Sequence, residues 1–226
     1  MATYILLIEG VGADSSESLC RHLEGQDYQL LTANTPEIAG EQITTWPDLI
    51  VLNHSNTLPF DSDRIISRNF LKIPLVVVGN KTGLNGEIPF DTIMAAPHHP
   101  QQLAQAVRKA TSKQQSRFIR LPGLVLDCYT RQILCEGQVH SLTPKEFKLL
   151  HLLMSQLNQV VGRKTIMEKV WETDYLGDTR TLDVHICWLR QKIEVDPSCP
   201  QRLITVRRLG YRLVIPPLPD PTQSNG

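Results

Sequence analysis

The chain has 226 residues, 41% of them hydrophobic and 20% charged, a composition typical of a globular protein. This length favours two domains of ordinary size over one. Its longest apolar runs, such as LIVL and PLVVV, are far too short to span a membrane. The N-terminus has neither a basic segment nor a small-residue cleavage site, so we expect a cytoplasmic protein without a membrane partner.

The formal net charge of zero conceals a difference between the two halves. Residues 1–112 contain 7 Lys and Arg against 12 Asp and Glu, whereas residues 113–226 contain 16 against 11. The second half is therefore basic and is the place to look for a polyanionic partner. The 5 cysteines are odd in number and lack CxxC spacing, which predicts free thiols.

The first half alternates short apolar runs with polar, helix-like stretches. Strands are expected at Tyr4–Ile8, Tyr28–Thr32, Asp48–Leu52, Leu75–Val78 and Thr92–Met94, and helices at Ser15–Glu24, Pro36–Thr44, Asp61–Phe70 and Pro100–Thr111. This alternation indicates a parallel sheet covered on both faces. We predict an α/β domain over residues 1–112, a linker over 113–120, a second domain over 121–215 and a disordered, proline-rich tail over 216–226.

The second half changes character. Its expected elements are strands at Leu124–Asp127, Gln132–Cys135 and Val139–Ser141, helices from Thr143, at Thr165–Trp171 and at Arg180–Glu194, and a hairpin of Leu203–Val206 and Tyr211–Val214. In TPKEFKLLHLLM, Thr143 is a good N-cap, Pro144 fits the first helical position and Glu146 completes a capping box. Strands, three helices and a terminal hairpin predict a winged helix-turn-helix domain of the α+β class.

The segment RTLDVHICWLRQKIE predicts an amphipathic helix with an unusual outer face. Its inner face gathers the aliphatic side chains Leu182, Ile186, Leu189 and Ile193. The opposite face gathers Arg180, Thr181, Val184, Cys187, Trp188 and Gln191, with Arg190 on a flank. A merely solvated face would not explain the exposed Trp and Val. Such a face fits the major groove of DNA, and the arginines of the hairpin (Arg207, Arg208 and Arg212) suit a narrow minor groove.

Residues from about Leu121 to Val214 resemble the effector domain of OmpR/PhoB-type bacterial response regulators. The resemblance rests on four segments in the family's order and spacing: LTPKEFKLLHLLM, VVGRKTIMEKVW, DTRTLDVHICWLRQKIE and ITVRRLGYRL. It implies a transcription factor whose long helix enters the major groove of double-stranded DNA and whose wing enters the minor groove. The implied contacts are Arg180, Thr181, Val184, His185, Trp188, Arg190, Arg207 and, to the DNA backbone, Trp171.

The same resemblance implies partners. The family binds tandem half-sites as a homodimer, and a loop after the second helix can contact RNA polymerase. In this sequence the loop is Glu172, Thr173, Asp174, Tyr175, Leu176, Gly177 and Asp178. Two positions depart from the family's pattern: Cys187 stands where Arg or Ser is frequent, and Arg208 replaces a glycine common in the wing turn.

The first half resembles the family's receiver domain, a flavodoxin-like (CheY-like) α/β fold. A working receiver has a phosphoryl-accepting Asp after the third strand, an acidic pair that holds Mg²⁺ after the first, a Ser or Thr after the fourth and a Lys after the fifth. The corresponding residues here are Asn53, Glu9 with Gly10, Gly79 and Ala96. Because a neutral amide cannot form an acyl phosphate, we predict a pseudo-receiver controlled independently of phosphorylation.

The stretch between the fourth and fifth strands, GNKTGLNGEIPFD, leaves no room for the receiver's fourth helix. In the family that helix forms part of the dimer surface of the activated receiver. The usual dimer face is therefore expected to be incomplete, and the route to a dimer is left open.

Other functions remain open. The winged helix could bind a protein and act as an adaptor, and steep salt dependence would favour DNA instead. A small molecule in the altered pocket or a redox switch at Cys128, Cys135 or Cys187 could carry the signal. A metal site at His54, His98 and His99 is a further alternative, and no cofactor is expected. An enzyme is not expected, because Gly10 and Gly12 do not make a phosphate-binding fingerprint.

Overall fold

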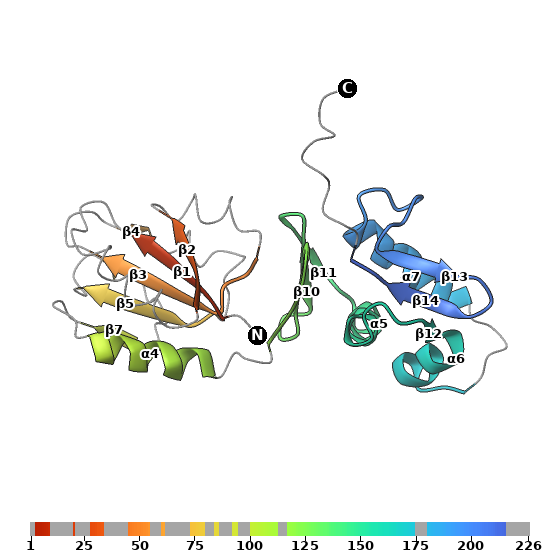
Figure 1. The fold of residues 1–226 in the computed structure, drawn as a ribbon, viewed down its shortest axis with the longest axis horizontal. Helices are drawn as coiled ribbons and strands as arrows, with labels where there is room; N and C mark the ends of the chain where they lie inside the picture. The colour runs from red at the N-terminus through yellow and green to blue at the C-terminus, as the bar shows by residue number, and fades with distance from the viewer. Residues whose placement is uncertain are drawn as a thin grey trace, which may run out of the picture. The chain divides into compact units, whose positions relative to one another are not determined.

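The structure is a computed structural model of the whole chain, and it divides into two compact units, Met1–Phe118 and Ile119–Gly226 (Figure 1). It describes residues 3–9, 20, 28–33, 45–54, 60–61, 73–79, 84–85, 92–94, 100–112, 117–174 and 180–215. Among these residues, no helix is long and apolar enough to cross a membrane.

The first unit is built on a parallel sheet of 5 strands in the order β2-β1-β3-β5-β7. Its strands are β1 (Thr3–Glu9), β2 (Tyr28–Ala33), β3 (Leu49–His54), β5 (Leu75–Gly79) and β7 (Thr92–Met94). All five predicted strands are present, and this strand order is that of the flavodoxin-like fold. The predicted fold of the first half is therefore confirmed.

Helix α4 (Pro100–Ser112) packs against one face of this sheet (Figure 1). Its Leu103 and Val107 are buried against residues of β1, β3 and β5, among them Ile5 and Leu7. The intervening residues Leu6 and Ile8 are equally buried. Since alternate residues of a strand face opposite sides of a sheet, the central strands are buried on both faces, as their apolar runs predict.

Some predictions for the first half differ from the structure, and others lie outside the described residues. A short parallel pair, β4 (Phe60–Asp61) with β6 (Leu84–Asn85), includes Asp61, with which a helix was predicted to begin. Within the predicted helix Ser15–Glu24 only Cys20 is described, and it is helical. The helix Pro36–Thr44 and the remainder of 61–70 lie outside the described residues, as does the tail 216–226.

The second unit begins with an antiparallel sheet of 4 strands in the order β11-β10-β9-β8. These are β8 (Phe118–Leu121), β9 (Leu124–Asp127), β10 (Gln132–Cys135) and β11 (Gln138–Ser141). Strand β8 lies partly inside the stretch predicted as linker, residues 113–120. Its first residue is buried and the next three are half-buried, so the three apolar residues of FIRL belong to a sheet although the stretch before them is polar.

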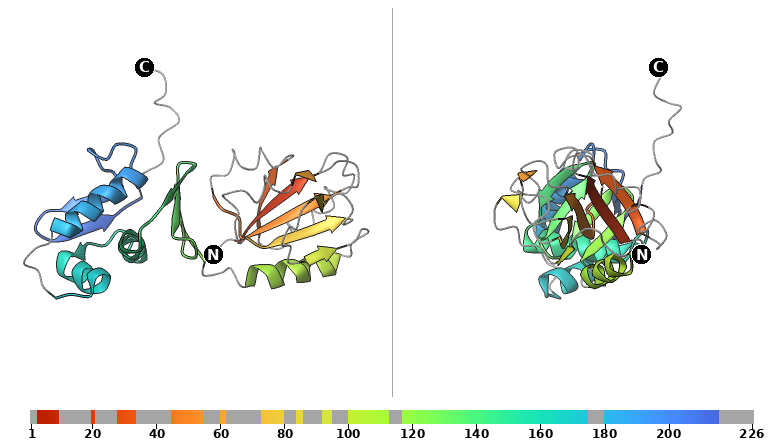
Figure 2. Two further views of the ribbon diagram at one scale, coloured as in Figure 1. Left: turned by 180° about the vertical axis from the view of Figure 1, so that it is seen from behind. Right: turned by 90° about the vertical axis from the view of Figure 1, so that its left-hand side faces the viewer.

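Three helical segments and a second sheet complete the unit. They are α5 (Pro144–Ser155), α6 (Arg163–Ile166) continued by a π-helical turn (Met167–Trp171), and α7 (Arg180–Ile193), with the 3-stranded sheet β12-β14-β13 formed by Val161–Gly162, Gly210–Leu213 and Leu203–Val206. Figures 1 and 2 show α7 lying across one face of that sheet. One apolar core joins both sheets to all three helices. The predicted winged-helix architecture is confirmed.

The start of α5 has the capping arrangement that its sequence predicts. The Thr143 hydroxyl accepts a hydrogen bond from the Glu146 backbone N–H (3.3 Å), and Glu146 Oε2 accepts one from the Thr143 N–H (2.7 Å). Strand β12 was not predicted, because only two residues, Val161 and Gly162, pair with the distant strand β14. A pairing this short has no period in the sequence.

Candidate functional site

The outer face of α7 presents polar and apolar side chains together. Leu182, Ile186, Leu189 and Ile193 are buried, as the helical wheel predicts. On the opposite side Arg180, Thr181 and Cys187 are exposed. Val184 and Trp188 retain 44% and 43% of their exposure, respectively, although both side chains are apolar. An apolar patch on a charged helix of this kind is typical of a surface that binds another molecule.

An aromatic row continues this face toward the preceding helical turn. The His185 ring lies 5.1 Å from the Trp171 ring, edge to face, and 5.0 Å from the Trp188 ring. His185 Nδ1 lies 2.8 Å from the Thr181 carbonyl oxygen, so this nitrogen carries the hydrogen in that contact and Nε2 is left for another partner. Lys145 Nζ lies 6.0 Å from the Trp171 ring centre. The row thus brings together three predicted contact residues.

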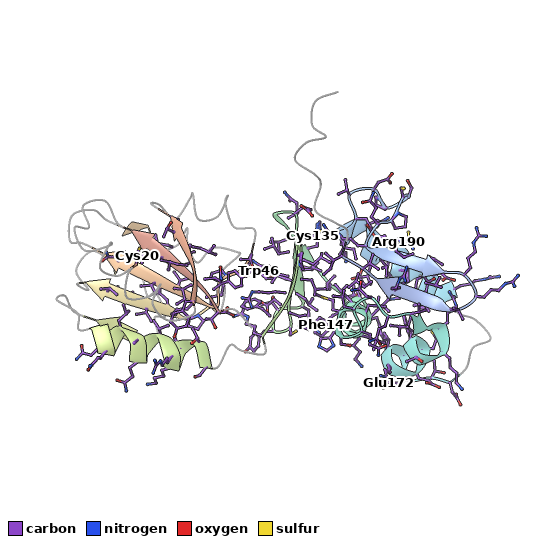
Figure 3. The ribbon with its side chains drawn as sticks, viewed as in Figure 1. Cys20, Trp46, Cys135, Phe147, Glu172 and Arg190 are labelled. Atoms are coloured by element: carbon purple, nitrogen blue, oxygen red, sulfur yellow. The ribbon has the colours of Figure 1, made fainter. Side chains whose placement is uncertain are left out.

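Arg190 has a partner inside the protein (Figure 3). Its Nε and Nη2 donate to the Leu203 carbonyl oxygen at 3.1 and 2.8 Å, and Nη2 also donates to Thr205 Oγ1 at 2.8 Å. These bonds tie the second half of α7 to strand β13. Arg190 is therefore a strut between the helix and the wing, and its predicted contact with DNA stays a prediction.

A hydrogen-bonded triad fixes the start of α7 against the wing and α6. Arg163 and Asp183 form a two-bonded ion pair, with Nη1–Oδ1 and Nη2–Oδ2 distances of 2.9 Å. The Tyr211 hydroxyl donates to Asp183 and accepts from Arg163 Nη1 (3.0 Å). The hydrogen bonds from Arg163 lower the pKa of Asp183. Sequence reasoning missed this triad, because its members lie on three separate elements.

The wing turn consists of Arg207, Arg208 and Leu209, and all three side chains are exposed. A hydrogen bond from the Leu209 N–H to the Val206 carbonyl (3.0 Å) closes the turn. Gly210 follows where β14 meets β12, and a Cβ at this position would lie 2.0 Å from the Val161 carbonyl oxygen. Only glycine permits this approach of two backbones.

The far end of α7 is anchored through a buried carboxylate. Lys192 Nζ donates to Glu146 Oε1 and Oε2 at 2.7 and 2.8 Å and to the Ser141 carbonyl at 3.0 Å. Burial opposes ionisation of Glu146, but the hydrogen bonds from Lys192 and Thr143 outweigh it and lower the pKa of this carboxyl. Both ends of the helix are thus held in place by charged contacts.

The loop predicted to contact RNA polymerase is described only over Glu172, Thr173 and Asp174; residues 175–178 lie outside the described residues. Glu172, which is labelled in Figure 3, ends the π-helical turn. It has a left-handed conformation, with φ +59°. Its carboxylate accepts a hydrogen bond from Lys148 Nζ at 2.7 Å, which lowers its pKa. This pair is exposed, so it contributes little to stability.

The carboxyl edge of the five-stranded sheet brings three of the predicted receiver residues together. Strand register places Glu9 beside Asn53, and His54 beside Gly79. Asn53 is 5% exposed, and its Nδ2 has no hydrogen-bond acceptor within the described part of the chain. Gly79 has φ +129°, a conformation that L side chains rarely adopt. Gly10 and Ala96 lie outside the described residues.

The structure describes the cysteines of the redox alternative but only part of the histidine metal site. Cys135 pairs with Leu124 across the hairpin, whereas Cys128 follows the other end of β9, about 13 Å further along the strand. Cys128 and Cys135 are therefore too far apart to form a disulfide with each other. Burial raises the pKa of both thiols. Within the described segments no cluster of three potential metal ligands occurs, and His98 and His99 lie outside them.

Residues 137–213 match the family model described as transcriptional regulatory protein, C terminal. Over 198 residues the chain is 35% identical to the alkaline phosphatase synthesis transcriptional regulatory protein SphR of Synechococcus elongatus, covering 80% of this chain and 75% of SphR. The chain belongs to the OmpR/PhoB family of response regulators. A stretch of 88 residues is 46% identical to the sensory transduction protein RegX3 of Mycolicibacterium smegmatis, and this match covers 39% of each chain.

Two solved structures resemble the chain, one over part of its length and one over nearly all of it. The DNA-binding domain of RstA from Klebsiella pneumoniae, solved in complex with the RstA box, is 28% identical, with a TM-score of 0.41, and covers 43% of this chain and 97% of that domain. The Thermotoga maritima OmpR/PhoB homologue DrrB is 21% identical, with a TM-score of 0.40, and covers 95% of this chain and 100% of DrrB.

Proposed function

We propose that this chain regulates transcription by binding specific DNA sequences through α7 and the wing. The outer face of α7 carries the proposal, because exposed Val184 and Trp188 lie there beside exposed Arg180 and Thr181. A fixed helix of this width fits the major groove, where arginine recognises guanine and valine contacts a thymine methyl. The proposed contacts are Arg180, Thr181, Val184, His185, Trp188, Arg190 and Arg207, with Trp171 at the DNA backbone.

Salt dependence and two arginine variants test DNA binding against the adaptor alternative. A cognate duplex is obtained by selection from random sequence, and its Kd is measured between low and physiological salt. Several phosphate contacts predict a steep loss of affinity with salt. Arg180→Ala and Arg207→Ala should each cost about 1–3 kcal/mol at the cognate site. Arg131→Ala is the control, since Arg131 is exposed in the β9–β10 turn. If neither variant changes Kd, the adaptor interpretation replaces ours.

Two exposed cysteines offer an independent footprint of the interface. Cys187 lies on the outer face of α7, whereas Cys199 lies in the segment that follows the helix. Cognate DNA should therefore slow maleimide labelling of Cys187 and leave that of Cys199 unchanged. Equal labelling of both thiols with and without DNA would place the interface elsewhere.

We further propose that the receiver unit is a pseudo-receiver whose control does not use an aspartyl phosphate. Asn53 offers a neutral amide at the carboxyl end of β3, beside Glu9, and φ +129° at Gly79 disfavours the Ser or Thr of a working receiver. Acetyl phosphate, or beryllofluoride with Mg²⁺, should change neither DNA affinity nor oligomeric state. A clear shift in either would contradict the proposal.

The proposed assembly is a homodimer on tandem half-sites in the cytoplasm, with RNA polymerase reached through the loop Glu172–Asp178. The half-site repeat seen in other helix-turn-helix proteins supports this geometry. A genome-wide footprint of the bound protein would give the half-site spacing directly. A footprint of one isolated half-site would contradict the dimer and leave the DNA-binding proposal standing.

A further inference from the structure

The turn of the wing contains an arginine in a conformation that suits glycine. Arg208 has φ +64°, in the left-handed region that side chains with a Cβ disfavour. Its neighbours fix this conformation: the Leu209 N–H bonds to the Val206 carbonyl, and the Arg163 N–H donates to the Leu209 carbonyl at 3.1 Å. The turn therefore imposes a destabilising conformation on a residue that glycine would serve better.

Within the described part of the chain, the side chain of Arg208 gains no compensating contact. It is exposed, and among the described residues it has neither an acidic partner nor a hydrogen-bond acceptor. Other arginines of this unit have such partners: Arg163 bonds to Asp183, Arg190 to the Leu203 carbonyl, and Arg202 to Glu136. The described residues therefore do not offset the cost at Arg208.

The wing turn lies at the end of the unit where α7 begins (Figures 1 and 2). Arg163 joins the two places, because its backbone N–H bonds to Leu209 in the turn and its guanidinium bonds to Asp183 in the first turn of α7. A polyanion bound along the first turn of α7 would therefore also meet the wing turn. Arg207 and Arg208 are consecutive in that turn, so one guanidinium can enter a groove while the other reaches the flanking phosphates.

We propose that Arg208 is a second DNA contact of the wing, one that binds a backbone phosphate, at a position where it lowers the stability of the free protein. This inference rests on the proposed DNA-binding function. A phosphate contact carries no sequence information, so it strengthens binding to any duplex by a similar factor. Stability and affinity thus place opposite demands on this one residue.

Arg208→Gly tests the proposal, and Arg131→Gly is its matched control. Arg131 is also exposed and left-handed, with φ +56°, but it lies in the β9–β10 turn of the same unit. Both variants lose one positive charge and one strained conformation. Each should raise the Tm by about 2–4 °C. Only Arg208→Gly should weaken DNA binding, by about five-fold near physiological salt, on cognate and scrambled duplexes alike.

The salt dependence identifies the kind of contact. Loss of one phosphate contact reduces the slope of log K against log salt by about 0.9. Arg208→Lys should retain this slope, because a lysine also serves as a point charge for phosphate. A variant Arg208→Gly that keeps the affinity and slope of the unmodified chain would overturn the inference alone. Absence of salt-dependent binding by the unmodified chain would overturn the proposed function with it.

Discussion

Two buried polar side chains, one in each unit, have opposite surroundings. Glu146 at the start of α5 is 1% exposed, and its carboxylate accepts hydrogen bonds from Lys192 and Thr143. Asn53 at the end of β3 is 5% exposed, and its Nδ2 has no acceptor among the residues that the structure describes. Burial of the polar group is thus compensated at Glu146, whereas at Asn53 none of the described residues compensates the burial of Nδ2.

The two units also differ in the contacts that hold their candidate sites in place. In the winged-helix unit, charged contacts hold both ends of α7, and a backbone approach that needs glycine holds the wing. At the receiver edge the sheet is intact, but the residue beside Glu9 is a neutral amide. The fold of a receiver depends on its apolar strands, so it survives changes at the edge where phosphoryl chemistry would take place.

The largest effect is expected at the wing strand. Gly210→Ala would place a Cβ 2.0 Å from the Val161 carbonyl oxygen, so β12 and β14 must separate. We expect a loss of about 3 kcal/mol in the free energy of unfolding, measured by urea titration. Gly162→Ala is the control, since the nearest atoms to its Cβ lie 3.9 Å away. Equal losses in both variants would mean that the approach of the backbones is not the cause.

The next largest effect is expected at Glu146, the buried carboxylate that accepts hydrogen bonds from Lys192 and Thr143. Glu146→Gln should lower the stability by about 2 kcal/mol at pH 7, because Lys192 loses a charged acceptor. The folded pKa of Glu146 is lowered, so its contribution is present above the unfolded value of about 4.3 and is lost as pH falls through the folded value. Urea titrations from pH 7 to pH 3 should show a smaller decline for the variant. Parallel curves for both proteins would contradict this account.

A smaller effect is expected where the ion pair is partly exposed. Asp183→Asn should cost about 1 kcal/mol, because the Arg163 and Asp183 side chains keep 30% and 51% of their exposure. DNA affinity should also fall, since Asp183 holds α7 to Tyr211 of the wing. Glu168→Gln serves as the control, because it weakens a surface pair of 3.8 Å elsewhere in the same unit. If the control weakens DNA binding as much, the triad has no special role.

The smallest effect is expected at the uncompensated position. Asn53→Leu removes a buried amide for which the described residues offer Nδ2 no acceptor, so the free energy of unfolding should change by less than about 0.5 kcal/mol or should rise. Asp48→Leu, just before the same strand, should instead cost about 1–3 kcal/mol, because Asp48 Oδ2 accepts from the Tyr4 N–H at 2.9 Å. Fluorescence of buried Trp46 reports unfolding of this unit. A large loss for Asn53→Leu would break the comparison.

Periodic patterns predicted most of the fold correctly. The apolar runs identified the five parallel strands, Thr143 with Glu146 identified the start of α5, and the wheel separated Leu182 and its fellow core residues from Val184 and Trp188. These features depend on neighbours in the sequence. The π-helical turn at Met167–Trp171 continues α6 and was predicted only as part of a short helix.

Contacts between distant segments could not be predicted in the same way. The two-residue strand β12 exists only through its pairing with β14. Arg190 was assigned to DNA alone, yet its guanidinium also bonds to β13, thirteen residues further along the chain. The triad of Arg163, Asp183 and Tyr211 spans 48 residues, and no local period relates its members.

Arg163 holds the start of α7 and the wing turn at a fixed distance from each other. Its backbone bonds to the tip of the hairpin and its side chain to the first turn of α7, so the two parts cannot slide past each other without breaking both attachments. A DNA site that binds both parts would then need a constant spacing between the contact of α7 in the major groove and the contact of the wing in the minor groove. One base pair inserted between these two contacts would rotate the contact of the wing by about 34° around the double helix, where the wing could not reach it.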